Sequence, residues 1–363
     1  MIDIKKITVG KNLLSIDFLR FIAAFAVYYY HQHIGLLISK QTNIGWFEYT
    51  DIIGEKYAVP LFFLISGFCI HYSSLKSLKN ENAIDLKKFY LNRFWRIYPP
   101  YLIALFTSIA LLKILPFSTP ISVNDFFIHL GLLQGLVKTS FNTINLVLWT
   151  ITIELCLYII YPIFYHLKRK YTLNIALYVV AGVSILSIIF CQLKENDLSL
   201  PVQYLFTNIW FGWCFGAWLC EKYVLEQHFF QTKKWKILSI ITIFAFVLSF
   251  FLSWDNDILV KYNIYIIVWS PLLIICILNE NFFARYNKLL TIPLAIGASS
   301  YSLYLLHQPL IVFKNFVIYY YFSNQTIISI CLVLGVFAIP AVCYLNYQLF
   351  ELPFMSFRKN AKQ

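Results

Sequence analysis

The feature that most constrains the fold is a succession of long apolar segments. Each holds about 20 residues, the length that a helix needs to cross a lipid hydrocarbon core. Of the 363 residues 60% are hydrophobic and 13% are charged, whereas soluble domains carry about 25% charged residues. We therefore predict an all-α fold, a polytopic transmembrane bundle of about ten spans, at 14–38, 57–75, 97–115, 146–167, 171–192, 203–221, 235–254, 260–279, 299–321 and 325–348.

The basic residues between these spans predict the orientation of the chain. Of the 29 Lys and Arg residues, 21 fall on the N-terminal side of the membrane and six on the other. Lysine and arginine favour cytoplasmic loops, so both termini are expected in the cytoplasm. The same placement accounts for the net charge of +12 without nucleic acid as a partner.

The rest of the chain predicts one transmembrane domain over 1–350 and a short basic cytoplasmic tail over 351–363. We expect no cleaved signal peptide before the first span. Segment 124–137 is apolar but too short to span, which favours an interfacial or re-entrant helix. The eight cysteines form no CxxC pair, so neither a disulfide framework nor a metal site is predicted.

The first span keeps Asp17, Arg20 and His31, although ionisable groups are costly in hydrocarbon. Arg20 and His31 are 11 positions apart, so in a continuous helix they share one face and lie about 16 Å apart along its axis. This spacing suits two groups that hold opposite ends of one elongated ligand.

Polar residues of three spans are predicted at a similar depth in the outer half of the membrane. From the helical rise, His31, Ser66 and Glu154 lie about 10–14 Å below the outer surface. If these spans are neighbours, the three side chains converge on one site. The alternatives are a histidine and a glutamate with structural partners inside the bundle, and a close-packing role for Ser66-Gly67.

The inner half of the membrane has a second set of candidates. Arg93 and Arg96 are spaced i, i+3 where the second cytoplasmic loop enters the third span. The planar guanidinium pairs well with phosphate, and the alternative is an ordinary positive-inside anchor. His307 lies about 12 Å from the cytoplasmic face, beside Pro309, which is expected to kink the helix.

Six motifs in this order resemble those of the membrane-bound acyltransferase-3 family, the bacterial O-acetyltransferases that modify surface polysaccharides. One departure is Ala58, where the family often has glycine. The motifs are Arg20 and His31 with ten residues between them, Phe62-Phe63-Leu64-Ile65-Ser66-Gly67-Phe68, Arg93 with Arg96, Ile97 and Pro99, Trp149 to Glu154, Ser300 to Pro309, and Glu351 with Pro353.

The resemblance implies a donor site for acyl-CoA, with acetyl-CoA as the expected donor. Its phosphates would lie on Arg93, Arg96 and Arg20. The other residues that we assign to the donor site are Ser66, Trp149 and His307.

The resemblance also implies a glycan or lipid-linked sugar as acceptor, on the other side of a bacterial cytoplasmic membrane. His31 would act as general base on the acceptor hydroxyl, and Glu154 would orient it and stabilise its imidazolium. An acetyl-histidine intermediate remains open. Some members of the family carry an additional extracytoplasmic esterase-like domain. We expect none in this sequence, so the membrane domain itself, or a partner, is expected to complete the transfer.

Two other classes of protein are compatible with intramembrane Arg, His and Glu. The first is a transporter or flippase for an anionic glycolipid or solute, although the paired halves typical of transporters are absent from the sequence. The second is a non-catalytic scaffold or sensor, which gives no reason for the shared depth of His31 and Glu154. The residues do not identify the acceptor.

Overall fold

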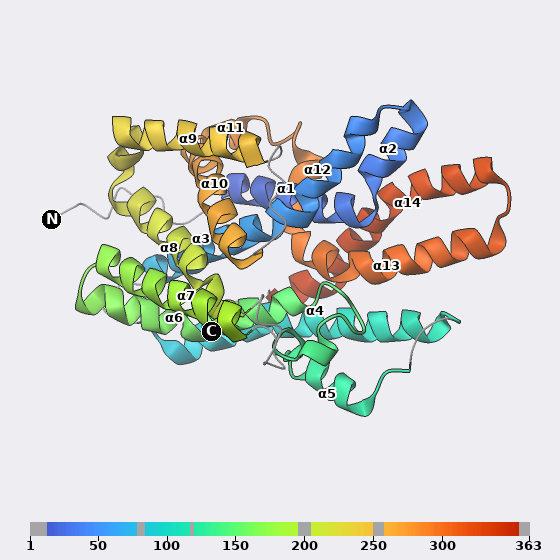
Figure 1. Cartoon of the computed structure of the whole chain (residues 1–363), viewed down its shortest axis with the longest axis horizontal. Helices are drawn as coiled ribbons and strands as arrows, with labels where there is room; N and C mark the ends of the chain where they lie inside the picture. The colour runs from blue at the N-terminus through green and yellow to red at the C-terminus, as the bar shows by residue number, and fades with distance from the viewer. Residues whose placement is uncertain (1–12, 78–83, 117–119, 195–204, 250–257, 356–363) are drawn as a thin grey trace.

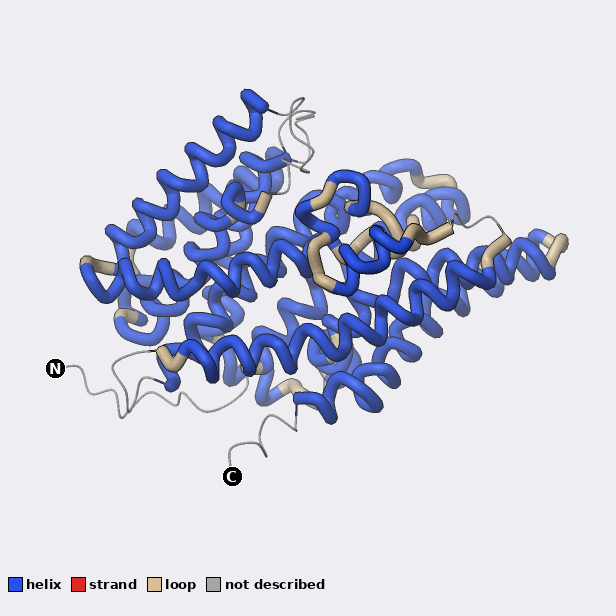
Figure 2. Tube along the Cα trace, turned by 90° about the horizontal axis from the view of Figure 1, so that it is seen from below, coloured by secondary structure: helices blue, strands red, loops and turns tan. Residues whose placement is uncertain are grey.

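The structure, a computed structural model, describes residues 13–77, 84–116, 120–194, 205–249 and 258–355, and within these ranges it is helical without a β-strand (Figure 2). Figure 1 labels the helices. The α-helices are α1 Leu14–His31, α2 Ile34–Thr42, α3 Ala58–Ser77, α4 Leu86–Ile114, α5 Val123–Leu130, α6 Trp149–Lys170, α7 Leu173–Lys194, α8 Trp210–Leu225, α9 Lys233–Ser249, α10 Ile258–Leu278, α11 Glu280–Arg285, α12 Thr291–Ala298, α13 Ser300–Tyr321 and α14 Gln325–Asn346.

Each predicted span overlaps one long helix of the fold, so the all-α prediction is confirmed for the described residues. Within the described ranges six helical segments are long and apolar enough to cross a membrane, and a seventh is counted if a bent pair forms one span. A span count of ten and cytoplasmic termini stay predictions. The six segments are Ala58–Leu75, Leu86–Ile114, Trp149–Lys170, Leu173–Lys194, Lys261–Leu278 and Gln325–Met355.

The bent pair corrects the prediction of a continuous first span over 14–38. Helix α1 ends at His31, and α2 leaves it at an angle of 62°. The turn arises at His33, whose φ of 50° lies in the left-handed region that breaks a right-handed helix. Helix α2 then packs on the 3₁₀ segment η2, Gly45–Asp51, where Asp51 accepts from the Gly35 N–H at 3.0 Å. His31 therefore lies at a helix end, and its predicted depth no longer follows.

Helix α3 lies in the middle of the bundle and packs against α1, α8 and α10. Its closest approach is to α8, where glycines lie on both sides of the contact. A Cβ added to Gly67 would overlap the backbone carbonyl of Trp213, and one added to Gly216 would overlap that of Leu64. Glycine at these two positions lets the two backbones meet, as in other tightly packed membrane helices.

The N-terminus of α1 is held by two neighbouring short helices. Glu280 of α11 accepts from the backbone N–H groups of Leu14 and Ser15 at 2.6 and 3.0 Å, so it satisfies donors that a helix start leaves open. Gly297 of α12 lies against the carbonyl of Asp17. These contacts fix the first turns of α1, which carry Arg20.

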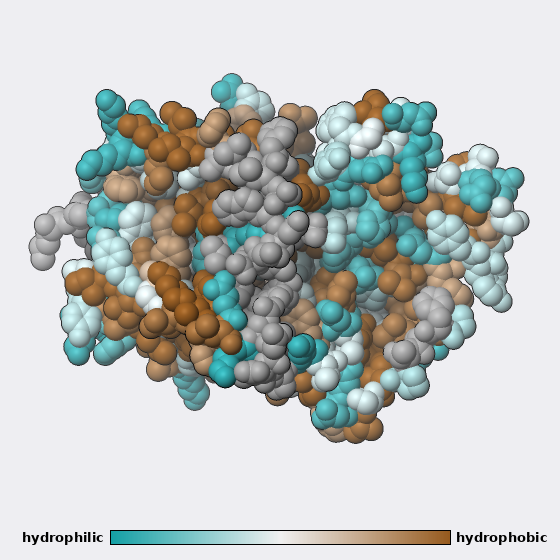
Figure 3. Space-filling view, viewed as in Figure 1, coloured by the Kyte–Doolittle hydropathy of each residue, from teal (hydrophilic) through white to brown (hydrophobic). Residues whose placement is uncertain are grey.

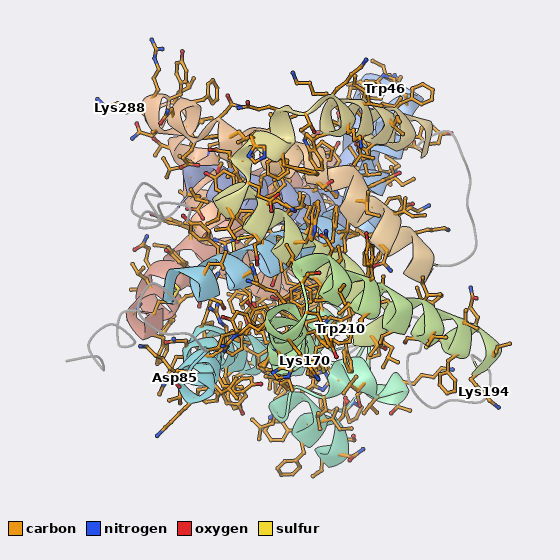
Figure 4. All side chains as sticks on the ribbon, turned by 90° about the vertical axis from the view of Figure 1, so that its left-hand side faces the viewer. Trp46, Asp85, Lys170, Lys194, Trp210 and Lys288 are labelled. Carbon is orange, nitrogen blue, oxygen red and sulfur yellow. The ribbon has the colours of Figure 1, made fainter. Side chains whose placement is uncertain are left out.

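The outward faces of α7, α9 and α14 are strongly apolar. Figure 3 shows apolar surface over α9 and over α6 and α7, and Figure 4, which looks along the long axis, shows side chains crowded between the helices, with Lys194 and Lys288 at the rim. Large exposed apolar areas suit contact with lipid. Examples on α7, α9 and α14 are Leu186, Phe190, Ile240, Phe244, Leu334 and Phe337.

Candidate functional site

A cavity lies inside the bundle, between α1, α3, α4, α6 and α13. Its empty volume is about 880 Å³, including space that is open to the surroundings. Five residues singled out from the sequence line it together, although they come from four different helices. They are Arg20, Ser66, Arg93, Arg96 and Glu154. The chain therefore brings the predicted cationic and carboxylate groups into one internal space.

The residues along one face of α3 contact a different type of side chain at each level of the cavity. Phe62, Ser66, Cys69 and Ser73 are spaced three or four residues apart, so they follow one another along a single helix face. Their partners change from aromatic to carboxylate to guanidinium in that order. From Phe62 to Ser73 the helical rise gives about 16 Å. The cavity thus runs from an aromatic wall to a cationic end.

The middle of the cavity holds a buried hydroxyl–carboxylate pair. The Ser66 hydroxyl of α3 donates to Oε1 of Glu154 of α6. Trp213 of α8 donates its Nε1–H to the same Ser66 oxygen at 3.0 Å. The hydrogen bond shows that the side chains of Ser66 and Glu154 meet, as the sequence predicts if their helices are neighbours, and that Ser66 faces the cavity while Gly67 packs on α8.

Two of the three arginines at the cationic end have partners within the protein. Arg20 donates Nη1 to Asp17 Oδ1 at 3.1 Å and Nη2 to Cys69 Sγ at 3.6 Å. Arg93 donates Nη2 to Ser73 Oγ at 2.9 Å, and its guanidinium lies over the Tyr158 ring, 5.8 Å from the centroid. The i, i+3 pairing of Asp17 with Arg20 has the geometry expected from the helix period.

Arg96 differs from the other two arginines. It lines the cavity but makes no hydrogen bond or ion pair with any residue of the described ranges. Electrostatic interactions link it to three acidic residues, Asp17, Glu154 and Glu351. Its donors are therefore available to a ligand that enters the cavity.

His31 lies against the second predicted histidine and not against Glu154. Its Nδ1 is 3.1 Å from Nε2 of His307, and the two rings stack with centroids 5.0 Å apart. Nδ1 of His307 lies 3.0 and 2.9 Å from the carbonyl oxygens of Leu303 and Tyr304. His307 is almost fully buried, whereas His31 is partly exposed.

These contacts assign the protons of the histidine pair when both rings are neutral. Carbonyl oxygens only accept, so Nδ1 of His307 carries a hydrogen and its Nε2 is left as an acceptor. His31 must then donate from its own Nδ1 to His307. The remaining nitrogen of His31, Nε2, carries a lone pair. His31 is thus held in the tautomer that a base acting through Nε2 requires.

The structure corrects three of the sequence-based placements. Trp149 does not line the cavity, because its ring stacks on Phe141 with centroids 5.2 Å apart. His31 and His307 do not line it either. Among the described contacts Glu154 is hydrogen-bonded to Ser66 and to Tyr158, so the expected orienting contact between Glu154 and His31 is absent and His307 occupies that place.

A wall of aromatic rings separates the cavity from the histidine pair. Tyr304 lines the cavity, and its ring lies 5.5 Å from that of Phe62 and 5.9 Å from that of His307. Its hydroxyl bonds to Thr150 Oγ1 at 3.0 Å. The cavity and His31 are therefore two ring contacts apart.

Several residues at or beside the cavity were missed at the sequence level. Cys69, Tyr158 and Trp213 lie in continuous apolar runs, where nothing in the pattern distinguishes them from core residues. Tyr304 and Thr150 stand inside two of the recognised motifs, which is the only signal that could have found them. Within the described ranges no group of three or more His, Cys, Asp or Glu side chains could hold a metal ion.

A buried histidine outside the cavity lining, His71, is part of a hydrogen-bonded network. It lies inside α3 and is fully buried. Its Nε2 is 2.7 Å from Glu221 Oε2 and its Nδ1 is 2.9 Å from the Tyr161 hydroxyl, and Lys168 pairs with the same carboxylate at 2.5 Å. This network joins α3, α6 and α8 outside the lining of the cavity.

The fold and the cavity are those of a multi-pass membrane protein with an internal cavity. The family model described as an acyltransferase domain, of the acyltransferase-3 type, matches residues 13–347. The chain belongs to this family, and it is an acyltransferase. No solved structure matches it.

Two relatives illustrate the similarity. A putative acetyltransferase, ORF330, of Acidianus two-tailed virus is 25% identical over 317 residues, which cover 84% of this chain and 85% of the relative. The O-acetyltransferase OatA of Staphylococcus aureus strain NCTC 8325 / PS 47 is 25% identical over 382 residues. That match covers 96% of this chain but 58% of OatA, so the chain spans little more than half of OatA's length.

Proposed function

We propose that this acyltransferase moves an acetyl group from acetyl-CoA to a hydroxyl of a cell-surface or lipid-linked glycan in a bacterial cytoplasmic membrane. The observation that carries the proposal is the ordered face of α3, which leads from arginines to a hydroxyl–carboxylate pair within one cavity. The similarity to proteins named O-acetyltransferase and putative acetyltransferase supports the acyl group and the oxygen acceptor.

The cationic end suits the phosphates of the donor. Arg96 has its donors available, and Arg93 lies one helical turn away on α4. A guanidinium binds phosphate through two parallel N–H bonds, which fixes both position and direction. A donor anchored there extends its arm along α3, whose face covers about 16 Å between Ser73 and Phe62. That length is similar to an extended pantetheine arm, so a donor whose arm is bent can present its thioester at Ser66, about 10.5 Å from Ser73.

The histidine pair suits activation of the acceptor. His31 is partly exposed at the end of α1, with Nε2 left as the basic nitrogen. As general base it takes the proton of the attacking hydroxyl, a role that typically contributes 10²–10⁴-fold, or about 3–5 kcal/mol. His307 positions His31 through the bond to Nδ1 and supports the positive charge that His31 acquires.

The test measures acetyl transfer by purified protein in lipid nanodiscs, with radiolabelled acetyl-CoA and an extract of envelope glycans. His31→Asn should abolish transfer. His33→Asn is the matched control, because His33 is an exposed histidine two residues away and asparagine tolerates its left-handed backbone. Full transfer by folded His31→Asn protein would refute the role of His31. Binding of an anionic glycolipid without acetyl-CoA consumption would instead support the transporter alternative.

A further inference from the structure

The cavity proposed for the donor and the proposed base His31 are separated by the rings of Tyr304 and His307, and this separation raises the question of what receives the acyl group inside the cavity. His31 does not line the cavity, whereas Ser66 does. The ring of Tyr304 stands between them, in contact with both Phe62 and His307. A direct attack by a His31-activated hydroxyl would require the donor thioester to cross this wall.

Ser66 has the partners that an activated nucleophile needs. Its hydroxyl donates to the carboxylate of Glu154, which is placed to take the proton. It also accepts the Trp213 Nε1–H at 3.0 Å. A hydroxyl oxygen has two lone pairs, so one lone pair of Ser66 Oγ remains for attack. The indole N–H stabilises the negative charge that develops on Oγ as the hydroxyl proton leaves.

Its place along α3 matches the expected place of the thioester. Ser66 lies seven residues from Ser73, about 10.5 Å along the helix, and Ser73 accepts from Arg93. Four residues beyond Ser66 lies Phe62, part of the aromatic wall. A donor with its phosphates at the arginines therefore presents its acyl end to Ser66 before it meets the wall.

We propose that Ser66 is the nucleophile of a two-step reaction and carries the acyl group as a serine ester. In the first step the bond from Ser66 Oγ to the acyl carbon forms and the thioester C–S bond breaks. Glu154 takes the hydroxyl proton, and coenzyme A leaves as a thiolate that is protonated by water on the donor side. This inference rests on the proposed function, because it assumes an acyl-CoA donor.

In the second step the acceptor oxygen attacks the ester carbon of acyl-Ser66, and the bond from Ser66 Oγ breaks. Glu154 returns its proton to Ser66 Oγ, and His31 takes the proton of the acceptor hydroxyl and releases it to water on its own side. Coenzyme A has already left on the donor side, so it never has to pass the wall. The acceptor reaches the ester once the side chains of Phe62 and Tyr304 move apart.

Isotope exchange tests this step without any acceptor. A two-step reaction exchanges radiolabelled coenzyme A into acetyl-CoA, because the first half-reaction is reversible by itself. Wild-type protein in nanodiscs should show this exchange. Ser66→Ala should lose both exchange and glycan acetylation. Ser74→Ala, a buried serine two turns along the same helix and outside the cavity lining, should keep both.

Two further variants keep the result decisive. Ser66→Cys preserves a nucleophile, so it should retain exchange and trap the acyl group as a thioester that neutral hydroxylamine cleaves; this result shows that loss in Ser66→Ala is not a folding defect. His31→Asn should keep exchange while losing glycan acetylation, because His31 acts only in the second step. Mass spectrometry of the quenched wild-type protein should locate the acetyl group on the peptide that contains Ser66.

The failure of this inference differs from the failure of the proposed function. Glycan acetylation by wild-type protein without exchange would overturn the serine ester and leave the transferase intact. Exchange that survives in Ser66→Ala, or an acetyl group found on His31, would overturn it as well. Absence of both acetyl-CoA consumption and exchange in wild-type protein would instead reject the proposed donor.

Discussion

Replacing His307 by phenylalanine removes the acceptor of the His31 Nδ1–H bond while it keeps an aromatic ring at the buried position. The lost bond joins the two rings at 3.1 Å, and it is a bond between uncharged groups when both rings are neutral. Such a bond contributes about 0.5–1.5 kcal/mol net, and a factor of ten in rate corresponds to 1.36 kcal/mol. If His307 acts only by positioning His31, His307→Phe should slow glycan acetylation by about 2- to 13-fold.

The same reasoning fixes the other corners of a double-mutant cycle. His31→Asn should slow acetylation by about 10²–10⁴-fold, the usual contribution of a general base. The double variant should be no slower than His31→Asn, since His307 has nothing left to position. His307→Gln should recover part of the loss, because its amide oxygen can accept from His31. The assay is the initial rate of acetyl transfer to envelope glycans at saturating acetyl-CoA.

Two results would refute this account. If His307→Phe slows the His31→Asn protein by the same factor as it slows the wild type, the two histidines act independently. If His307→Phe alone is as slow as His31→Asn, His307 itself carries out an essential step and is more than a positioning residue.

Three other predictions concern the donor site and the helix packing. Arg96→Ala should raise KM for acetyl-CoA by about 10- to 150-fold, the range expected when hydrogen bonds to a charged group are lost. KM for acetyl-pantetheine, which lacks the nucleotide phosphates, should not change. An equal rise in KM for both substrates would contradict phosphate binding by Arg96. Gly67→Ala should lower stability by about 1–3 kcal/mol through overpacking on Trp213, seen as a lower Tm in detergent, whereas Gly182→Ala, whose added Cβ meets no atom within 4 Å, should not. Glu280→Ala should lower Tm by removing about 0.5–2 kcal/mol of capping from α1, and an unchanged Tm would show that Leu14 and Ser15 find other acceptors.

The helices were predictable because hydropathy reports them directly. Predicted spans 57–75 and 171–192 differ from α3 and α7 by two residues or fewer at either end. Helix rise predicted a similar depth for Ser66 and Glu154, and α3 and α6 are uninterrupted from their starts to these residues; that the two helices are neighbours came only from the structure. The number of membrane crossings did not follow in the same way, because α1 and α13 carry ionisable residues and α8 has 16 residues, so length and composition alone do not qualify them.

The environment of His31 could not be predicted, because it depends on a break that the sequence does not signal. Neither glycine nor proline stands at 32 or 33, and a left-handed histidine is uncommon. Trp213 was missed for a different reason. It reaches Ser66 only because Gly67 and Gly216 bring two helices together, and that contact joins residues far apart in the chain.

Charge pairing within the cavity separates the roles of two arginines that the sequence groups together. Arg20 already has a carboxylate at 3.1 Å and a sulfur at 3.6 Å, so an anion that binds it must compete with Asp17. Arg96 has no such partner in the described structure, and its three acidic neighbours act on it only at longer range. A phosphate therefore gains more from Arg96, since no existing ion pair must break. On this argument Arg20, paired with Asp17, is part of the cavity wall, and we propose Arg96 as the main contact for the donor phosphates.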